Sequence, residues 1–359
     1  MQRRIFLAGA LAMGAAACAA RRTPPPFDAV VRKDGRGTHS RVADAIASAP
    51  RTGSQPFRIL VGRGHWHEKL VVDRPHIHLQ GEGREASVLS FDAAAGMARP
   101  DGQAWGTWGC ASVIVRAPGF RASQLRIENA FDYVGNLSTP RFEPIGPNGA
   151  QAVALMLDEG SDQCRLHDVD LWGHQDTLFT EAGRSHFSRC RIAGSVDFVF
   201  GAGQATFDAC ELRSRFRPGK PRQGYVAVPS TPASQPLGLV FRQCRLTRES
   251  AVPDASVALG RAWRPGRRFP DGQYGDPQAQ GHAAFLDCWM DAHIDPALGW
   301  EPMAYTARDG QRVMLEPQDA RLFEAGSMGP GAARSANRRW LSNAQAEALR
   351  AAAWPGAPR

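Results

Sequence analysis

Phe187-Ser-Arg-Cys190-Arg-Ile192 and Phe207-Asp-Ala-Cys210-Glu-Leu212 are two copies of one short pattern, in which an aromatic residue is followed by cysteine and then by an aliphatic residue. The pattern returns at 241–246 and 285–290, with weaker copies at 120–125 and 161–166. Intervals of 20 to 44 residues separate the strong copies. A short fixed core with variable insertions is typical of a parallel β-helix, in which equivalent residues of successive coils stack inward about 4.8 Å apart. The repeats therefore predict an all-β solenoid.

Composition places the chain among soluble, folded proteins. Hydrophobic residues make up 43% of its 359 residues and charged residues 22%, which excludes the disordered and low-complexity classes. No run of eighteen apolar residues occurs, so no membrane-spanning helix is expected. The formal net charge of +8 favours an acidic partner: nucleic acid, anionic lipid or a polyanionic carbohydrate. Because the basic residues are scattered and do not interleave regularly with aromatic residues, nucleic acid is not expected as a partner.

Residues 1–20 have the features of an export signal. Arg3 and Arg4 directly precede apolar residues, which is typical of a twin-arginine signal. Cys18 follows three alanines, a permissive lipoprotein cleavage box, so a lipidated Cys18 is predicted as the mature N-terminus. Ordinary cleavage at an Ala-x-Ala site is the alternative. After the Pro-rich spacer at 21–27, the protein is expected as an outer-membrane lipoprotein or in the periplasm, with secretion as the alternative.

Residues 28–350 are predicted to form one β-helix domain with a short helix near each end. The stretch 40–49 has a helical pattern that Pro50 ends. A capping-box pattern opens a second helix over 342–350, which we expect to cover part of the β-helix. We expect the protein to be a monomer.

Five cysteines have a place in this organisation and need no metal to explain them. There is no C-x-x-C and no cysteine–histidine spacing of the zinc type. The cysteines are predicted to form one internal ladder of small apolar side chains: Cys164, Cys190, Cys210, Cys244 and Cys288. Neighbouring coils lie within the Cα range of a disulfide, and an exported protein meets an oxidising compartment. A Cys190–Cys210 disulfide is therefore predicted, with free buried thiols as the alternative.

Other patterns that imitate functional motifs have structural explanations. The Gly-rich segment 81–86 follows a strand, but no helix pattern comes after it, so a turn between coils is expected rather than a dinucleotide loop. Four histidines alternate along strands without a clustered carboxylate and are predicted to face solvent rather than a metal: His65, His67, His76 and His78. The absence of Gly-x-Ser-x-Gly argues against an α/β-hydrolase.

Two segments, 173–179 (GHQDTLF) and 194–201 (GSVDFVFG), each place an acidic residue among apolar strand residues. Burial of a carboxylate is costly unless it is paired, so both aspartates require an explanation. Asp176 and Asp197 are 21 residues apart, close to one coil, so their carboxylates are expected to stack about 5 Å apart. One pKa should then rise while a cation such as Arg261 holds the other down. A structural aspartate ladder or a calcium site is the alternative.

These segments, together with LGRAW at 259–263, resemble the signature blocks of the pectin methylesterases, carbohydrate esterases built on a right-handed parallel β-helix. The family blocks are close to G-x-Q-D-T-L, G-x-V-D-F-I-F-G and L-G-R-P-W, in the same order. Flanking segments agree as well: 31–38, 151–155, 290–294 and 299–300. The resemblance covers roughly residues 28–350. Trp105-Gly-Thr107 and the export signal are more similar to bacterial, partly lipid-anchored members than to plant enzymes.

The resemblance implies a role for each residue of the predicted site. Asp197 would be the nucleophile that attacks the methyl-ester carbonyl of a galacturonate unit. Asp176 would donate a proton to the leaving methanol and later activate water. Gln151 and Gln175 would stabilise the tetrahedral oxyanion, and Arg261 would pair with Asp197.

The resemblance also implies substrate contacts. Trp263 would stack on a sugar ring. Two departures from the family lie nearby: Ala262 replaces the usual proline, and Phe179 stands where tyrosine is frequent, so one substrate hydrogen bond would be missing. The remaining residues expected at the substrate are Thr107, Arg217, Tyr225, Phe179 and Phe200.

The leading hypothesis is thus a pectin methylesterase acting on methyl-esterified pectin or oligogalacturonides, without a cofactor or metal. The alternative is an esterase or thioesterase with the same fold that acts on an ester other than pectin. A polygalacturonase or pectate lyase would need other acidic or calcium-binding groups. A carbohydrate-binding β-helix without catalysis, the hypothesis from a different class, would have no need for two acids buried one coil apart.

Overall fold

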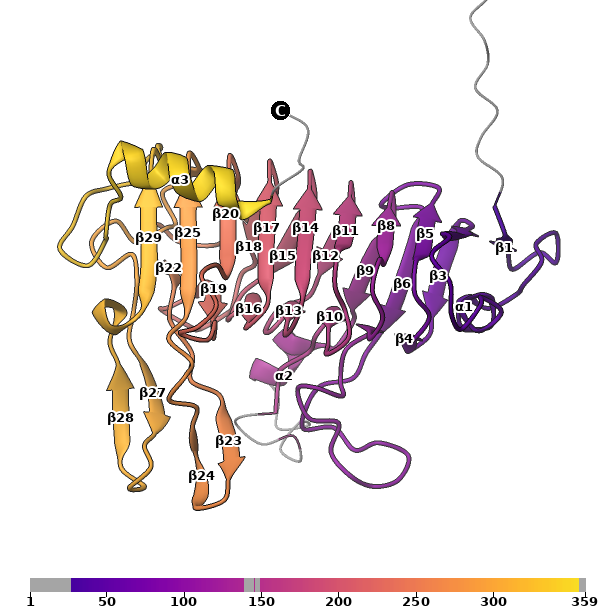
Figure 1. The fold of residues 1–359 in the computed structure, drawn as a ribbon, viewed down its shortest axis with the longest axis horizontal. Helices are drawn as coiled ribbons and strands as arrows, with labels where there is room; N and C mark the ends of the chain where they lie inside the picture. Colours follow the sequence, from indigo (N-terminus) through magenta and orange to yellow (C-terminus); the bar gives the residue numbers. More distant parts are fainter. Residues whose placement is uncertain (1–26, 139–144, 146–148, 355–359) are drawn as a thin grey trace, which may run out of the picture.

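The computed structural model describes residues 27–138, 145 and 149–354, and these residues form a stack of coils with three parallel sheets (Figure 1). Each full coil contributes one strand to each sheet, and every strand pairs with the equivalent strands of the coils before and after it. The predicted right-handed parallel β-helix is confirmed. The ten-stranded sheet extends from residue 29 to residue 325, and the other two sheets lie within these bounds.

The ten-stranded sheet consists of β1 (Ala29–Val31), β2 (Phe57–Val61), β5 (Ile77–Gly81), β8 (Arg121–Ser123), β11 (Cys164–His167), β14 (Arg184–Ser188), β17 (Gln204–Asp208), β20 (Leu239–Arg242), β25 (His282–Leu286) and β29 (Arg321–Ala325). The eight-stranded sheet consists of β3 (Gly64–His67), β6 (Ser87–Phe91), β9 (Arg126–Asn129), β12 (Asp170–Trp172), β15 (Arg191–Gly194), β18 (Glu211–Ser214), β21 (Arg245–Arg248) and β26 (Trp289–Met290). The seven-stranded sheet consists of β4 (Leu70–Val72), β7 (Val113–Val115), β10 (Leu155–Leu157), β13 (Leu178–Thr180), β16 (Val199–Gly201), β19 (Gly224–Pro229) and β22 (Val257–Gly260).

The phenylalanines of the repeat form a stacked column inside the coils. Phe187, Phe207, Phe241 and Phe285 are in register on successive strands of the ten-stranded sheet and are fully buried. Their ring centroids are 4.5–4.7 Å apart. Such offset stacking adds to the free energy gained by removing large apolar side chains from water. The strong copies of the repeat therefore predicted the core correctly.

The cysteine ladder lies at the corner where the ten-stranded sheet meets the eight-stranded sheet. The residue before each cysteine has a left-handed backbone, with a φ of 53° at Arg189 and of 50° at Ala209, which turns the chain from one strand into the next. Cys190, Cys210, Cys244 and Cys288 occupy this corner, as predicted.

The weak copies of the repeat were assigned in the wrong register. Cys164 begins β11 opposite Ser185, and Val169 takes the ladder position next to Cys190. In the preceding coil Leu125 takes that position, not Ser123. Where no cysteine marks the corner, the repeat can be aligned to the sequence in more than one way, because several nearby apolar residues fit its positions. Only the pairing of the strands then identifies which residue faces inward.

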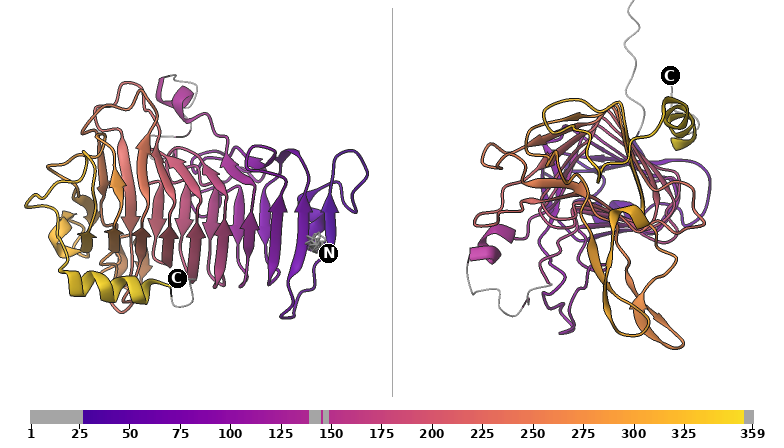
Figure 2. Two further views of the ribbon diagram at one scale, coloured as in Figure 1. Left: turned by 90° about the horizontal axis from the view of Figure 1, so that it is seen from above. Right: turned by 90° about the vertical axis from the view of Figure 1, so that its left-hand side faces the viewer.

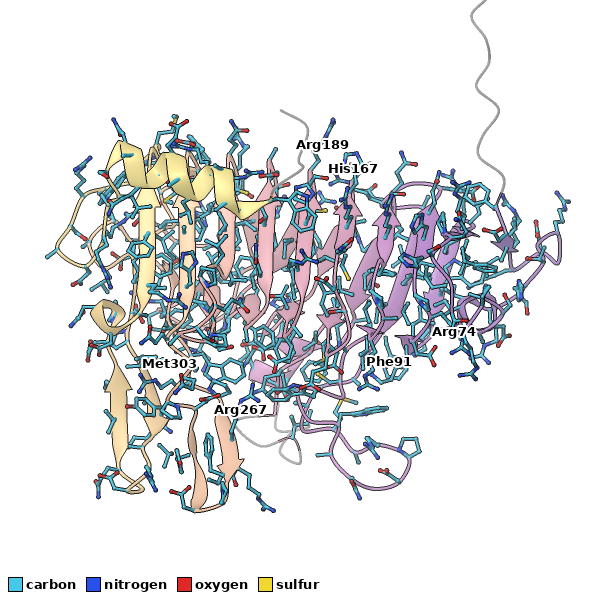
Figure 3. All side chains as sticks on the ribbon, viewed as in Figure 1. Arg74, Phe91, His167, Arg189, Arg267 and Met303 are labelled. Atoms are coloured by element: carbon cyan, nitrogen blue, oxygen red, sulfur yellow. The ribbon has the colours of Figure 1, made fainter. Side chains whose placement is uncertain are left out.

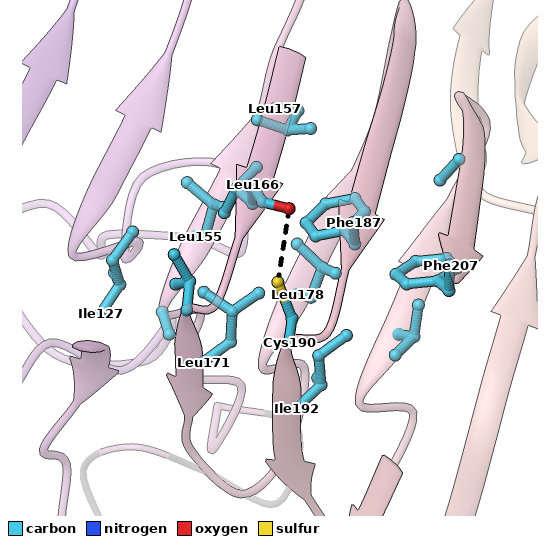
Figure 4. Packing of buried hydrophobic residues seen from close by; sticks show 14 of the residues in the cluster. Ile127, Leu155, Leu157, Leu166, Leu171, Leu178, Phe187, Cys190, Ile192 and Phe207 are labelled. Carbon is cyan, nitrogen blue, oxygen red and sulfur yellow. Dashed lines mark hydrogen bonds between the residues drawn. The ribbon is translucent and has the colours of Figure 1, made fainter. Parts of the chain in front are cut away.

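The predicted Cys190–Cys210 disulfide is wrong for this structure, in which all six described cysteines are free. The thiol of Cys190 points to the carbonyl oxygen of Leu166 at 3.5 Å (Figure 4), and that of Cys210 to the carbonyl oxygen of Phe187 at 3.4 Å. Burial also raises the pKa of both thiols well above the usual range. Because a disulfide forms through the thiolate, sealed and protonated thiols resist oxidation.

We therefore expect thermal unfolding to be insensitive to reductant. The melting temperature measured by circular dichroism should be the same with and without dithiothreitol, because no disulfide constrains the unfolded chain. A thiol titration in denaturant should find all six described cysteines reactive without prior reduction. A melting temperature that falls by several degrees on reduction would contradict the free-thiol arrangement.

Both predicted helices are present. Helix α1 (Val42–Ala47) packs at the N-terminal end of the stack, inside the predicted 40–49. Helix α3 (Asn343–Ala353) begins with the expected capping box between Ser342 and Gln345 and covers the outer face of the ten-stranded sheet over β20, β25 and β29. A short helix α2 (Tyr133–Ser138) and the 3-10 turn η2 (Pro317–Asp319) were not predicted.

The remaining elements are two antiparallel hairpins inserted between coils: β23 (Gly266–Phe269) with β24 (Gly272–Gly275), and β27 (Met303–Thr306) with β28 (Arg312–Leu315). Figure 2 shows that the hairpins and α2 lie on the side of the stack away from α3. This division separates two faces of the molecule that carry different side chains.

The export signal, Cys18 and most of the spacer lie outside the described residues, so the twin-arginine signal and lipidation stay predictions. Within the described part of the chain, no helix is long and apolar enough to cross a membrane.

Candidate active site

The seven-stranded sheet brings the two aspartates of the signature segments together. Leu178 and Phe179 of β13 pair with Val199 and Phe200 of β16, and this register places Asp176 opposite Asp197 on the next coil. Both aspartates have a left-handed backbone, with φ of 63° and 53°. Aspartate is among the few residues other than glycine that adopt this conformation at tolerable cost, and such backbone strain often accompanies functional sites.

Glycine and threonine in the same segments allow the two coils to approach closely. A Cβ at Gly194 would lie 2.2 Å from the Cβ of Phe198 and 2.6 Å from the hydroxyl of Thr177, so only glycine fits there. The buried Thr177 hydroxyl donates a hydrogen bond to the carbonyl of Ala193 at 3.1 Å. The local sequence thus holds the two aspartate turns against each other.

Arg261 binds Asp197 through two hydrogen bonds. Its Nε lies 3.0 Å from Oδ1 and its Nη2 lies 2.8 Å from Oδ2 of the carboxylate. Burial alone would lower the pKa of Arg261, but the adjacent Asp197 raises it overall. A planar, bidentate guanidinium–carboxylate pair is both strong and directional, so it orients the Asp197 carboxylate.

Asp176 is in the opposite electrostatic situation. It is 7% exposed, and burial together with the nearby Asp197 raises its pKa well above the usual range, although Arg261 opposes the shift. The protonated form is therefore favoured at Asp176, while Asp197 has a cationic partner. Two carboxyl groups with different environments can perform the work of an acid and a nucleophile in one site.

The ring of Tyr225 packs against the guanidinium group of Arg261. The guanidinium carbon lies 3.9 Å from the centre of the Tyr225 ring, a cation–π contact. The Tyr225 hydroxyl donates to Glu301 at 2.8 Å, and Glu301 also pairs with Arg222 at 2.6 Å. Burial, together with Glu301 and Asp197, raises the pKa of Tyr225 to about 12 although Arg261 opposes the shift, so the phenol stays neutral.

A cavity of about 250 Å³ opens above the two aspartates. Eight of its ten lining residues were predicted from the sequence: Thr107, Gln151, Gln175, Asp176, Asp197, Phe200, Arg261 and Trp263. Gln151 has a buried side-chain oxygen without a hydrogen-bond partner among the described residues. A polar group left unsatisfied at a cavity wall is available to a ligand, because burial without a partner otherwise costs about 1–3 kcal/mol.

Aromatic side chains form one wall of the cavity. Trp263 contacts Phe200 edge to face, with centroids 6.0 Å apart, and Phe200 stacks on Phe179 at 4.2 Å. Trp108 stands over Phe179 at 5.2 Å and is 44% exposed. Exposed aromatic faces of this kind bind the apolar face of a sugar ring or another flat ligand.

Sequence reasoning missed Val228 and Met303, which line the cavity, and Trp108, which stands beside it over Phe179. An exposed tryptophan one residue after Thr107, within the glycine-rich stretch WGTWG, was a usable signal for Trp108. Met303 had none, because it reaches the cavity from the β27–β28 hairpin, 106 residues after Asp197. Figure 3 shows Met303 and Arg267 where the two hairpins leave the stack.

Three residues expected at the substrate do not line the cavity. Phe179 is fully buried beneath Trp108, and Tyr225 lies behind Arg261. Arg217 points instead toward Tyr133 of α2, with its guanidinium 5.9 Å from the ring centre, and it donates to the carbonyl of Arg222 at 3.1 Å. In this structure the three residues support the site instead of facing it.

A calcium or other metal site, one of the alternatives for the aspartates, has no support in the geometry. No group of three or more candidate metal ligands occurs within the described ranges, and Arg261 occupies both oxygens of Asp197.

Comparison with known proteins adds independent evidence. The pectinesterase family model matches residues 28–269. Pectinesterase A of Dickeya dadantii (strain 3937) is 41% identical over 327 residues, or 89% of this chain and 88% of that protein. A pectin methylesterase solved in complex with a hexasaccharide has a TM-score of 0.88 at 41% identity and covers 93% of this chain and 99% of its own. The pectin methylesterase of Yersinia enterocolitica has a TM-score of 0.84 at 42% identity, over 89% and 100% of the two chains.

The fold, the site and these relatives define the class: the chain is an enzyme, a carboxylic ester hydrolase on a parallel β-helix. Within that class the chain belongs to the pectinesterase family, since the family model matches most of it and a relative of 41% identity spans nine-tenths of its length.

Proposed function

We propose that this protein is a pectin methylesterase that hydrolyses methyl esters of galacturonate units with Asp197 as nucleophile and Asp176 as acid and base. The observation that carries the proposal is the asymmetry of the two carboxyl groups that line one cavity. Arg261 binds and orients Asp197, while burial favours the protonated form of Asp176. Such a pair can supply both the nucleophile and the acid–base group of an ester hydrolase that uses neither serine nor cysteine as its nucleophile.

In the first half of the reaction, an Asp197 oxygen attacks the ester carbonyl and forms a tetrahedral intermediate. The amide groups of Gln151 and Gln175, which both line the cavity, donate hydrogen bonds to the developing oxyanion. Asp176 gives its proton to the methoxy oxygen, the carbon–oxygen bond breaks, and methanol leaves. The acyl group remains on Asp197 as an anhydride.

In the second half, Asp176 is a carboxylate and takes a proton from an incoming water. The hydroxide attacks the acyl carbon, and cleavage of the anhydride restores the Asp197 carboxylate. Arg261 then again donates its two hydrogen bonds to this carboxylate. Asp176 ends protonated, as it began, so the cycle closes. The proposed galacturonate product carries one carboxylate in place of each ester.

The aromatic wall and the charge of the chain support a polyuronate substrate. Trp263 and Trp108 offer faces on which sugar rings can stack. The net charge of +8 favours a polymer that becomes anionic as it is de-esterified. A related pectin methylesterase was solved in complex with a hexasaccharide. This supports a substrate chain that is longer than the single sugar unit that reacts in the cavity.

The test is methanol release from highly methylated pectin and from methylated oligogalacturonides. We expect methanol release from at least one of them, at a rate above that of p-nitrophenol release from a simple ester such as p-nitrophenyl acetate. No methanol from either substrate, with hydrolysis of a simple ester or a thioester retained, would remove the pectin assignment and favour another ester on the same scaffold.

A further inference from the structure

A second, larger cavity of about 560 Å³ lies on the outer face of the ten-stranded sheet, between Phe27 at one end and Trp354 at the other. This face is the one that carries α3, on the far side of the stack from α2 and the hairpins (Figure 2). In Figure 3, His167 of this groove lies near the opposite edge of the molecule from Met303 of the catalytic cavity. The groove is therefore separate from the catalytic site.

A row of basic side chains forms the floor of this groove. One residue from each of five successive strands stands in register with the next, from β2 to β14: Arg58, His78, Arg121, Arg165 and His186. Neighbouring strands are about 4.8 Å apart, so the row extends about 19 Å along the axis of the coils. We call it the basic row.

Most side chains of the basic row have no acidic partner that would offset the repulsion between neighbouring positive charges. Among the described residues, Arg58, His78, Arg121 and Arg165 form no ion pair, and only His186, at the end, binds an aspartate, Asp208 at 2.7 Å. Burial and the charge of Arg165 lower the pKa of Arg121, and burial followed by Arg121 and Arg58 lowers that of His78 to about 4. Like charges in register across a sheet repel one another.

The neighbouring sheet shows how this chain otherwise stacks arginines. There the residues in register on β9, β12, β15, β18 and β21 alternate in sign: Arg126, Asp170, Arg191, Glu211 and Arg245. Asp170 is fully buried and binds Arg126 at 3.2 Å. Structural stacking in this protein therefore uses interleaved acids. Their absence from the basic row points to an anion that comes from outside.

The shape of the row selects the kind of anion. Arg58, Arg121 and Arg165 carry the positive charge of the row, with the neutral His78 between the first two, and their alignment in a straight groove parallel to the coil axis matches a linear polymer that carries carboxylates along its length. Trp354 is 9% exposed and closes one end of the groove, stacked on His186 at 5.2 Å with the Arg165 guanidinium 5.5 Å from its ring. Arg58 and His78 are half-buried in the groove, whereas Arg121 and Arg165 are exposed to solvent.

We propose that this groove is a second polysaccharide-binding site, which holds a de-esterified, anionic stretch of polyuronate chain against Arg58, Arg121 and Arg165. The proposal rests on the proposed function, since that reaction produces such a stretch from a neutral ester. Binding product segments outside the catalytic cavity would keep the enzyme on a partly processed polymer.

The test compares the double variant Arg121→Gln/Arg165→Gln with a matched control, Arg51→Gln/Arg63→Gln. The control removes the same charge from two exposed arginines that line neither the groove nor the catalytic cavity. Affinity for unesterified polygalacturonate is measured by native electrophoresis in gels containing the polymer. We expect affinity to fall about tenfold or more in the groove variant and to change little in the control. Binding by the wild type should weaken with salt, as for any polyanion held by charge.

Methanol release from a methylated trigalacturonate, which is short enough to engage the catalytic cavity alone, should be unchanged in both variants. Equal affinity of the groove variant and the control for polygalacturonate would overturn the proposal. So would loss of binding to phosphatidylglycerol vesicles with polygalacturonate affinity intact, which would make this face a membrane surface. Absence of methanol release from the wild type would instead contradict the proposed function. If the double variant melts early, the single variant Arg121→Gln serves the same comparison.

Discussion

Replacing Asp197 by alanine is expected to reduce methanol release by about 10⁴-fold or more. The substitution removes the only atoms that attack the ester in the proposed reaction, and the oxyanion donors that remain cannot supply a nucleophile. The measurement is methanol release from highly methylated pectin under saturating substrate. Asp197→Ala with activity within tenfold of the wild type would show that another group attacks the ester.

Stability has to be controlled in this experiment because Arg261 would lose its partner. Removing one side of a buried ion pair leaves an uncompensated charge and costs up to about 3–5 kcal/mol. Asp197→Asn is the matched control, since its amide oxygen still accepts a hydrogen bond from Arg261 while its nucleophilicity is lost. We expect it to be folded by circular dichroism and equally inactive, which separates loss of chemistry from loss of fold.

Asp176→Asn is expected to lower the rate by about 10²–10⁴-fold, the usual contribution of a general acid and base. The loss should be smaller for an ester with a better leaving group, such as a p-nitrophenyl ester, because that group departs without a proton. The comparison of the two substrates is the measurement. An equal loss on both would contradict proton donation by Asp176.

The same substitution should make the protein more stable above about pH 5. The pKa of Asp176 is raised in the folded state, so folded protein holds a proton that the unfolded chain has lost above the ordinary aspartate range. The free energy of unfolding therefore falls as the pH rises. Asparagine has no such proton to lose. The gain in melting temperature of Asp176→Asn over the wild type should be small near pH 4 and larger at pH 7, and a constant difference would contradict the raised pKa.

Several features of the fold could be predicted because their cause is local. The strong repeat copies carry phenylalanine and cysteine at positions that only an inward-facing column explains, and the structure stacks those rings at 4.5–4.7 Å. The 21-residue separation of Asp176 and Asp197 similarly equals one coil, so the register of β13 and β16 follows. In a solenoid, the spacing of residues along the sequence gives their relative positions in space directly, which few other folds allow.

The errors have a common physical origin. Cys164 matched the repeat by residue type, but strand pairing places it at the start of β11, and Val169 fills the corner. The Cys190–Cys210 disulfide satisfied the distance between coils, yet both cysteines are free and buried, and burial raises the pKa of each thiol. Sequence spacing indicates which residues are neighbours and leaves open the direction in which a side chain points.

The sequence alone determined the solenoid and the two aspartates one coil apart, while the pairing of Arg261 with Asp197 was expected from the family resemblance. Those conclusions depend on residue type and on a repeat length, both of which are properties of the chain in one dimension. Only the tertiary structure decided that Tyr225 lies behind Arg261, that Met303 lines the cavity and that Trp108 stands beside it. The same holds for the basic row on the opposite face, four of whose five members form no ion pair with the described residues. Each of these depends on which side chains meet across coils separated by loops of variable length, and that information enters only when the coils are stacked.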